Sequence, residues 1–187
     1  MAGPGRSRRP EAPTPADLVT GGRGLLVLAC AVLVGLALSS GESPRTWWLA
    51  AIAALAWALD GVDGYVARRT GTETVHGARL DSGVDGALVL VMAVALVQVA
   101  PWGLVGGLLY PAFLLGQLVR PAWRRSLPGS WRGKVAGGAL TGTLVVATAP
   151  FWPVWAVQVA VAVAVALVVW SFAVDVAWLE RQRDRAT

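Results

Sequence analysis

The sequence has one cysteine, one lysine and few charges of either sign. Cys30 stands alone inside an apolar run, which excludes an internal disulfide and a metal cluster held by several thiolates. Only 14% of the residues are charged, whereas 56% are hydrophobic. This balance is rare in soluble domains and typical of proteins that cross a membrane several times. No nucleic-acid partner is expected.

Phenylalanine and tyrosine are also scarce, at three and two copies, but tryptophan occurs ten times. Indole rings favour the boundary between water and lipid, so this excess agrees with a membrane protein.

Six apolar stretches follow a segment rich in Pro, Gly and Arg. Residues 1–16 have the composition of a disordered basic tail. The stretches cover residues 24–40, 46–67, 80–100, 102–119, 134–150 and 152–178, and each reaches or approaches the length of about 20 residues that a spanning helix needs. We therefore predict an all-α integral membrane domain of six transmembrane helices over residues 17–179, with a charged tail at 180–187.

Basic residues fall almost entirely on one side of these predicted helices. With the N-terminus in the cytoplasm, fifteen of the sixteen Arg and Lys residues lie inside and only Arg45 lies outside. This asymmetry predicts that both termini are cytoplasmic. A cleaved signal peptide in place of the first helix is the alternative, because small residues follow the apolar run in "ALALSSGE".

Four aspartates interrupt the apolar pattern. Asp60 and Asp63 stand near the end of the second predicted helix, and Asp81 and Asp85 near the start of the third, so each pair shares a helical face. A short connection makes the two helices antiparallel neighbours, with both pairs at matching depth. Because unpaired carboxylates would repel one another and resist desolvation, a cation must lie among them. Ligands that are all oxygen predict a hard divalent ion, Mg²⁺ or Mn²⁺.

Glycines and an arginine accompany the aspartates. Gly64 and Gly77 flank the predicted cleft, where a bulky ligand needs access to the backbone, and Arg68 follows Gly64 by one turn. A metal ion and an arginine beside an accessible backbone suit a diphosphate. Glu73 and His76 are assigned to the connecting loop as solvated side chains rather than as ligands.

The pattern D-x2-D-G-x2-A-R-x8-G-x3-D-x3-D resembles the signature of the CDP-alcohol phosphotransferase family, integral membrane enzymes that make phospholipid head groups. Its eight positions are filled by Asp60, Asp63, Gly64, Ala67, Arg68, Gly77, Asp81 and Asp85.

Residues 14–27 are similar to the segment that leads into the first helix of this family. Pro15, Leu18, Thr20 and Arg23 stand at similar places, whereas Asp17 takes the position of an asparagine.

The resemblance implies metal and catalytic roles. Asp60, Asp63 and Asp81 would ligate a pair of Mg²⁺ ions, with Mn²⁺ as an alternative. Asp85 would complete the second metal site and act as the general base on the acceptor hydroxyl.

The resemblance also implies a nucleotide site. Gly64 and Ala67 would leave room for the cytidine nucleotide, Arg68 would hold the diphosphate, and Asp63 and Gly77 would border the same site. Since the family forms homodimers, a homodimer is expected.

The segment before the fifth predicted helix suggests the acceptor. Arg124, Arg125, Arg132 and Lys134 lie there, either through topology alone or as a pocket for a phosphorylated alcohol. Gly133 and Lys134 match a Gly-Lys-x-Lys-Thr segment of phosphatidylglycerophosphate synthases, and the later positions differ. We expect CDP-diacylglycerol as donor and glycerol 3-phosphate as acceptor, with inositol phosphate and phosphatidylglycerol as alternatives.

These features predict an enzyme of the bacterial inner membrane whose active site faces the cytoplasm at the ends of helices 2 and 3. It would transfer a phosphatidyl group to the acceptor and release CMP. The bacterial source is inferred from the excess of Arg over Lys and the abundance of Ala. A divalent-cation transporter is the alternative from another class, but all four acids lie on one side, and no charge occupies the middle or far half of the second and third predicted helices. An inert scaffold would not account for four facing carboxylates.

Overall fold

The computed structural model describes residues 15–70, 75–119 and 131–184, and every regular element within these ranges is an α-helix. The helices are α1 (Pro15–Ser39), α2 (Trp47–Thr70), α3 (Val75–Ala95), α4 (Gly103–Val119), α5 (Trp131–Ala147) and α6 (Val154–Asp184). They coincide in order with the six apolar stretches, and the all-α class is confirmed for the described residues.

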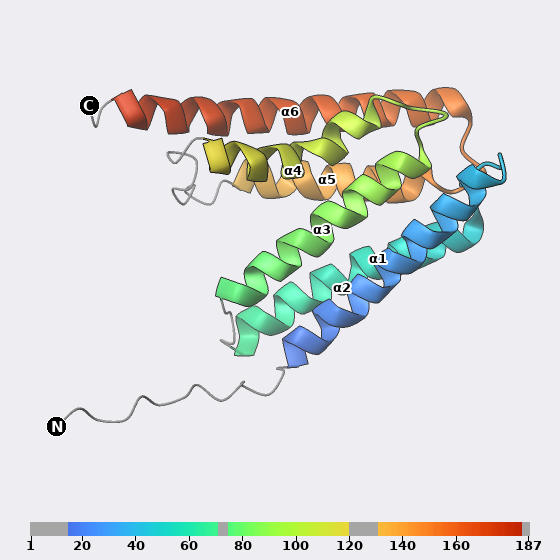
Figure 1. Ribbon diagram of the computed structural model, residues 1–187, viewed down its shortest axis with the longest axis horizontal. Coiled ribbons are helices and arrows are strands. Elements are labelled where there is room, and N and C mark those ends of the chain that lie inside the picture. Colours follow the sequence, from blue (N-terminus) through green and yellow to red (C-terminus); the bar gives the residue numbers. More distant parts are fainter. Residues whose placement is uncertain (1–14, 71–74, 120–130, 185–187) are drawn as a thin grey trace.

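The helices run up and down in two groups. α1 packs on α2 and α3, α3 packs on α4, α5 packs on α6, and α2 and α3 both contact α5 (Figure 1). The connections α1–α2, α3–α4 and α5–α6 lie at one end, which we name the short-loop end. α2 ends and α3 begins at the opposite end, named the aspartate end (Figure 1). Short connections impose this antiparallel order on neighbouring helices.

The turn between α1 and α2 is closed by helix caps. Gly41 has a φ of 76°, the left-handed conformation that ends many helices, and the N–H of Glu42 donates to the carbonyl of Ala37 at 2.8 Å. The Thr46 hydroxyl then accepts a hydrogen bond from the N–H of Leu49 at 3.2 Å and caps α2. The direction in which α2 leaves α1 is therefore set locally.

Arg45 ties this turn to the α5–α6 connection. Its Nε donates to the carbonyl of Ala147 at 3.2 Å, and its Nη2 donates to the carbonyls of Ala149 at 3.0 Å and Trp152 at 2.8 Å. Carbonyls at the C-terminus of a helix lack partners within the helix and favour a cation. Arg45 thus satisfies the end of α5 and fixes the short-loop end.

Glycines allow two close helix contacts. A Cβ at Gly107 on α4 would lie 3.1 Å from the Ala93 Cβ and 3.2 Å from the Leu90 Cα on α3. A Cβ at Gly142 on α5 would lie 2.9 Å from the Trp57 ring on α2. Small residues at such contacts let membrane helices approach one another closely.

Some helix limits differ from those expected. α3 begins at Val75 rather than near residue 80, so His76 belongs to the first turn of α3 and its placement in a loop was wrong. No proline interrupts residues 75–80, and one glycine is a tolerable cost within a helix. α3 ends at Ala95, ahead of a turn that leads into Pro101, and α6 extends beyond residue 178 to Asp184.

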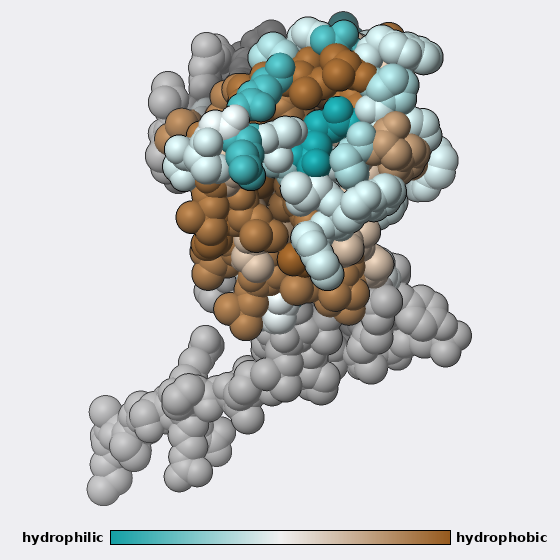
Figure 2. Space-filling model, turned by 90° about the vertical axis from the view of Figure 1, so that its right-hand side faces the viewer, coloured by the Kyte–Doolittle hydropathy of each residue, from teal (hydrophilic) through white to brown (hydrophobic). Residues whose placement is uncertain are grey.

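Among the residues that the structure describes, two helices are long and apolar enough to cross a membrane. Thr20–Ser39 of α1 and Val154–Trp178 of α6 meet this condition, and 22% and 28% of these segments are buried, so most of their apolar side chains face outward. The apolar part of α2, Trp47–Gly61, is shorter and has Asp60 next to its end, with Asp63 following it. Figure 2 looks onto the short-loop end and shows polar residues gathered there, with apolar residues along the adjoining flank.

Candidate active site

Three of the four aspartates meet at the aspartate end. Asp60 is on α2, and Asp81 and Asp85 lie one turn apart on α3. One carboxylate oxygen from each lies within 4.8 Å of the others. Their side chains are 35%, 40% and 43% exposed, respectively, so the cluster is partly open rather than sealed. The spacing along the two helices was enough to predict this convergence.

The remaining motif residues are placed by their backbone alone. Asp63, Gly64, Ala67 and Arg68 belong to the last turns of α2, and Gly77 belongs to the first turn of α3. Their side chains lie outside the described part of the structure, so their predicted roles stay predictions.

A buried arginine that had no predicted site role lies among the carboxylates. The Arg23 side chain on α1 is 1% exposed, and its Nη1 lies 2.9 Å from Asp60 Oδ1 and 2.5 Å from Asp81 Oδ1. Its Nη2 pairs with Asp85 Oδ1, and its Nε donates to the carbonyl of Ala56 at 3.3 Å. One guanidinium therefore joins three carboxylates from two helices to the backbone of α2.

The sequence contained a signal for this arginine. The aspartates required a cation among them, and an ionisable residue at membrane depth has a partner as a rule. Arg23 directly precedes the first apolar stretch, and Arg68 follows the second. Spacing along one chain cannot say which helix packs against the aspartates, so the contact between α1 and α3 had to come from the structure.

Within the described cluster, three carboxylates carry three negative charges and Arg23 carries one positive charge. Two negative charges remain, and burying them costs free energy unless another cation is present. Two oxygens on one divalent ion, each at about 2.0–2.6 Å from it, lie at most about 5 Å apart. The carboxylate oxygens meet that condition, so these residues fit a hard divalent cation.

The ion pairs with Arg23 leave each carboxylate able to bind a further cation. All three ion pairs involve the Oδ1 atoms, and each carboxylate has a second oxygen with lone pairs of its own. A carboxylate can therefore contact the guanidinium through one oxygen and a metal ion through the other.

The predicted acceptor residues are only partly described. Arg132 and Lys134 are exposed on the first turn of α5, which begins at the aspartate end of the bundle (Figure 1). Arg124 and Arg125 lie outside the described residues. The described pair presents positive charge at that end without belonging to the Arg23 cluster.

The CDP-alcohol phosphatidyltransferase family model matches residues 14–172, and the chain therefore belongs to this family. Comparison with curated proteins and with solved structures gives no significant match. The protein is accordingly an enzyme, a transferase of substituted phosphate groups that acts in phospholipid synthesis on a CDP-alcohol donor and an alcohol acceptor. Members are typically integral to the membrane and generally use a divalent metal ion. This membership decides against the transporter and scaffold alternatives.

Proposed function

We propose that this protein transfers a phosphatidyl group from CDP-diacylglycerol to a phosphorylated alcohol, glycerol 3-phosphate in the first place, and releases CMP. The observation that carries the proposal is the meeting of Asp60, Asp81 and Asp85 from two helices beside the buried Arg23. Inositol phosphate and phosphatidylglycerol are the alternative acceptors.

The aspartates are proposed to hold two Mg²⁺ ions, with Mn²⁺ as an alternative. Asp60, Asp81 and Asp85 offer converging oxygens, and Asp63 follows Asp60 by one turn on α2. When bound, such ions neutralise the diphosphate and stabilise the charge that develops on departing CMP. Arg23 supports the arrangement because it holds the carboxylates together from a third helix.

The nucleotide is proposed to bind along the last turns of α2. Gly64 and Ala67 leave room for it, and Arg68 offers two parallel donors to the diphosphate. Asp63 and Gly77 border the same site. The support is the fit of these residue types to the family's motif.

Asp85 is the proposed general base. It takes the proton from the acceptor hydroxyl while that oxygen forms a bond to the phosphorus of the phosphatidyl group. The bond from this phosphorus to the CMP oxygen breaks, and CMP leaves with the electron pair.

A phosphorylated acceptor is supported by the cations at the same end of the bundle. Arg132 and Lys134 are exposed on the first turn of α5, and we assign Arg124 and Arg125 to the same site from the sequence. Arg and Lys side chains bind phosphate by charge-assisted hydrogen bonds. An uncharged alcohol such as serine would have less use for them.

We further propose six membrane crossings in a domain at residues 17–179, in the inner membrane of a bacterium, with both termini and the site at the cytoplasmic face. The distribution of Arg and Lys supports this orientation. A homodimer is proposed from the family alone.

The test is CMP release by purified protein in detergent, with CDP-diacylglycerol, Mg²⁺ and a panel of acceptor alcohols. Glycerol 3-phosphate should give the highest rate, and EDTA should abolish turnover. An Asp85→Asn variant should lower kcat by about 10²–10⁴-fold or more while it still binds CDP, because it loses the general base and weakens the proposed second metal site. Full turnover by this variant would refute the base, and absence of CMP with every acceptor would refute the function.

A further inference from the structure

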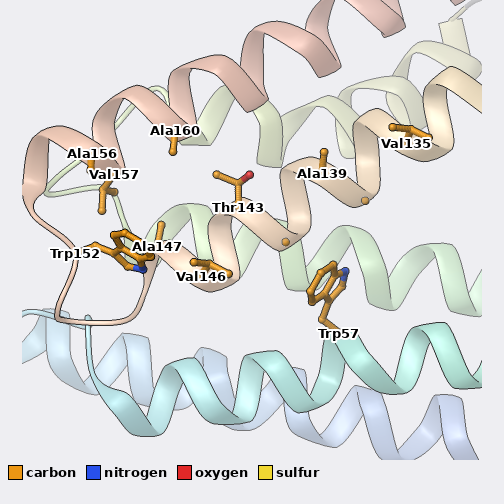
Figure 3. Close-up of a pocket in the computed structure, with 12 residues that line it drawn as sticks. Trp57, Val135, Ala139, Thr143, Val146, Ala147, Trp152, Ala156, Val157 and Ala160 are labelled. Atoms are coloured by element: carbon orange, nitrogen blue, oxygen red, sulfur yellow. The ribbon is translucent and has the colours of Figure 1, made fainter.

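An apolar groove of about 730 Å³ runs between α2, α5 and α6. α5 lines one side from Val135 to Ala147, and α6 contributes Ala156 and Ala160. Trp57 reaches toward α5 from α2, as Figure 3 shows. The function proposed above gives this groove no role.

Small side chains keep the groove open. Gly138 lies in its wall, and a Cβ built there would meet no atom within 4 Å. At Gly142, one turn later, there is no such space, because a Cβ there would lie 2.9 Å from the Trp57 ring. The indole therefore forms the wall of the groove beside Gly142, whereas Gly138, nearer the aspartate end, has open space around it.

The dimensions fit a flexible hydrocarbon chain. From Val135 to Ala147 the helix rises about 18 Å, more than the roughly 15 Å of one leaflet in a hydrocarbon core of about 30 Å. The lining includes one hydroxyl residue, Thr143, and no charged residue, so it suits an apolar ligand.

The groove begins beside the aspartate cluster. Trp57 precedes Asp60 by three residues, which is about 4.5 Å along α2. The neighbouring Ala56 accepts the hydrogen bond from Arg23, and Val135 directly follows Lys134 on α5. A lipid whose diphosphate lies at the aspartates can thus place a chain in the groove without crossing a polar surface.

The far end of the groove is fixed. Trp152 lines it at the α5–α6 turn, and Arg45 holds that turn through the carbonyls of Ala147, Ala149 and Trp152. A chain that enters beside Asp60 therefore meets a defined stop near the short-loop end.

We propose that this groove binds one acyl chain of the CDP-alcohol donor and makes turnover depend on the length of that chain. The inference rests on the function proposed above, because it requires a donor that carries acyl chains.

The test compares Gly138→Leu with Gly137→Leu. Both residues lie on α5, and at both a Cβ meets nothing within 4 Å, but only Gly138 lines the groove. The wild-type kcat/KM for CMP release should rise as the acyl chains of CDP-diacylglycerol lengthen from eight to sixteen carbons. Gly138→Leu should lower kcat/KM for the sixteen-carbon donor by about tenfold, through lost burial of a few methylene groups, and flatten the dependence on length. Gly137→Leu should keep the wild-type profile.

Ala160→Leu, which narrows the groove from α6, should act like Gly138→Leu. Inhibition by CDP should stay the same in all variants, since the nucleotide does not enter the groove, and this shows that the site is still formed. Identical length profiles for the Gly138 and Gly137 variants would overturn the proposal. The proposal would also be overturned if Gly138→Leu kept the wild-type length profile but lost a tightly held membrane lipid or changed its oligomeric state. No CMP from the wild type with any donor would instead refute the proposed function itself.

Discussion

At the scale of single residues, the site depends on a guanidinium that is far more buried than the carboxylates it contacts. The Arg23 side chain is 1% exposed, and those of Asp60, Asp81 and Asp85 are 35–43% exposed. Arg23 can bring the three carboxylates together, but one positive charge cannot neutralise all of them. The cluster is thus held together by the protein and still attracts a further cation.

Replacement of Arg23 by methionine should destabilise the protein and increase its response to Mg²⁺. The change leaves three carboxylates without their shared cation, and loss of one partner of a buried ion pair costs about 3 kcal/mol or more. In EDTA the variant should melt well below the wild type. Mg²⁺ should raise its Tm more than that of the wild type, because a ligand stabilises the folded state that binds it and the divalent ion restores the missing charge.

Arg45→Met is the matched control for this measurement. Arg45 also makes three hydrogen bonds from one guanidinium, but to backbone carbonyls at the short-loop end. Its loss should lower the Tm without increasing the response to Mg²⁺. If both variants responded to Mg²⁺ as the wild type does, Arg23 would have no influence on cation binding.

The residues of the site differ in how far they could be predicted. The convergence of Asp60, Asp81 and Asp85 could be predicted because helical spacing is local and a short connection brings the end of α2 near the start of α3. The prediction that the two helices pack side by side was wrong for the described residues, because both pack on α1 and on α5 instead. Arg23 could not be assigned, because its partners are 33 to 62 positions away and depend on how α1 packs. The need for a cation was correctly inferred, but it was assigned to metal ions alone.

At the scale of helices, packing depends on places where one backbone approaches another. Gly107 on α4 faces Ala93 and the backbone of Leu90 on α3, so a side chain there can be accepted only if α3 and α4 move apart. α3 carries two of the three clustered aspartates and packs on α4, so this contact helps to fix the position of α3 and its aspartates.

Gly107→Val should therefore destabilise the fold by about 1–3 kcal/mol, the usual cost of overpacking. Gly35→Val on α1 is the matched control, since it has the same change in helix propensity and a Cβ there meets nothing within 4 Å. Thermal unfolding in one detergent should give a clearly lower Tm for the Gly107 variant. Equal Tm values would show that α3 and α4 are not in close contact at this point.

The helices themselves were largely predictable, because long apolar runs punctuated by Pro and Gly leave few alternatives. The first and last residues of the helices were less predictable. α3 starts at Val75, since polar residues such as Arg79 and Asp81 do not stop a helix that has no breaker. α4 and α5 have 17 described residues each, which is at the short end of the range for a membrane crossing.

At the scale of the whole molecule, the two ends of the bundle differ in chemistry. Arg23 and the aspartates lie at one end, where α5 also begins with Arg132 and Lys134. The other end has the three short connections and an aromatic cluster, in which Trp47 stacks on Phe151 with ring centroids 5.6 Å apart. Aromatic rings of this kind favour the interface between lipid and water, and the basic residues favour the cytoplasmic side.

This polarity predicts the result of labelling with a maleimide that cannot cross membranes. Glu42 at the short-loop end and Arg181 near the end of α6 are both exposed, so a cysteine at either position can react. In intact cells Glu42→Cys should be labelled and Arg181→Cys should not, whereas both should be labelled after the membrane is opened. The native chain is its own control, because Cys30 is fully buried. Labelling of Arg181→Cys alone in intact cells would place the aspartates on the outer face, where a cytoplasmic CDP-alcohol could not reach them.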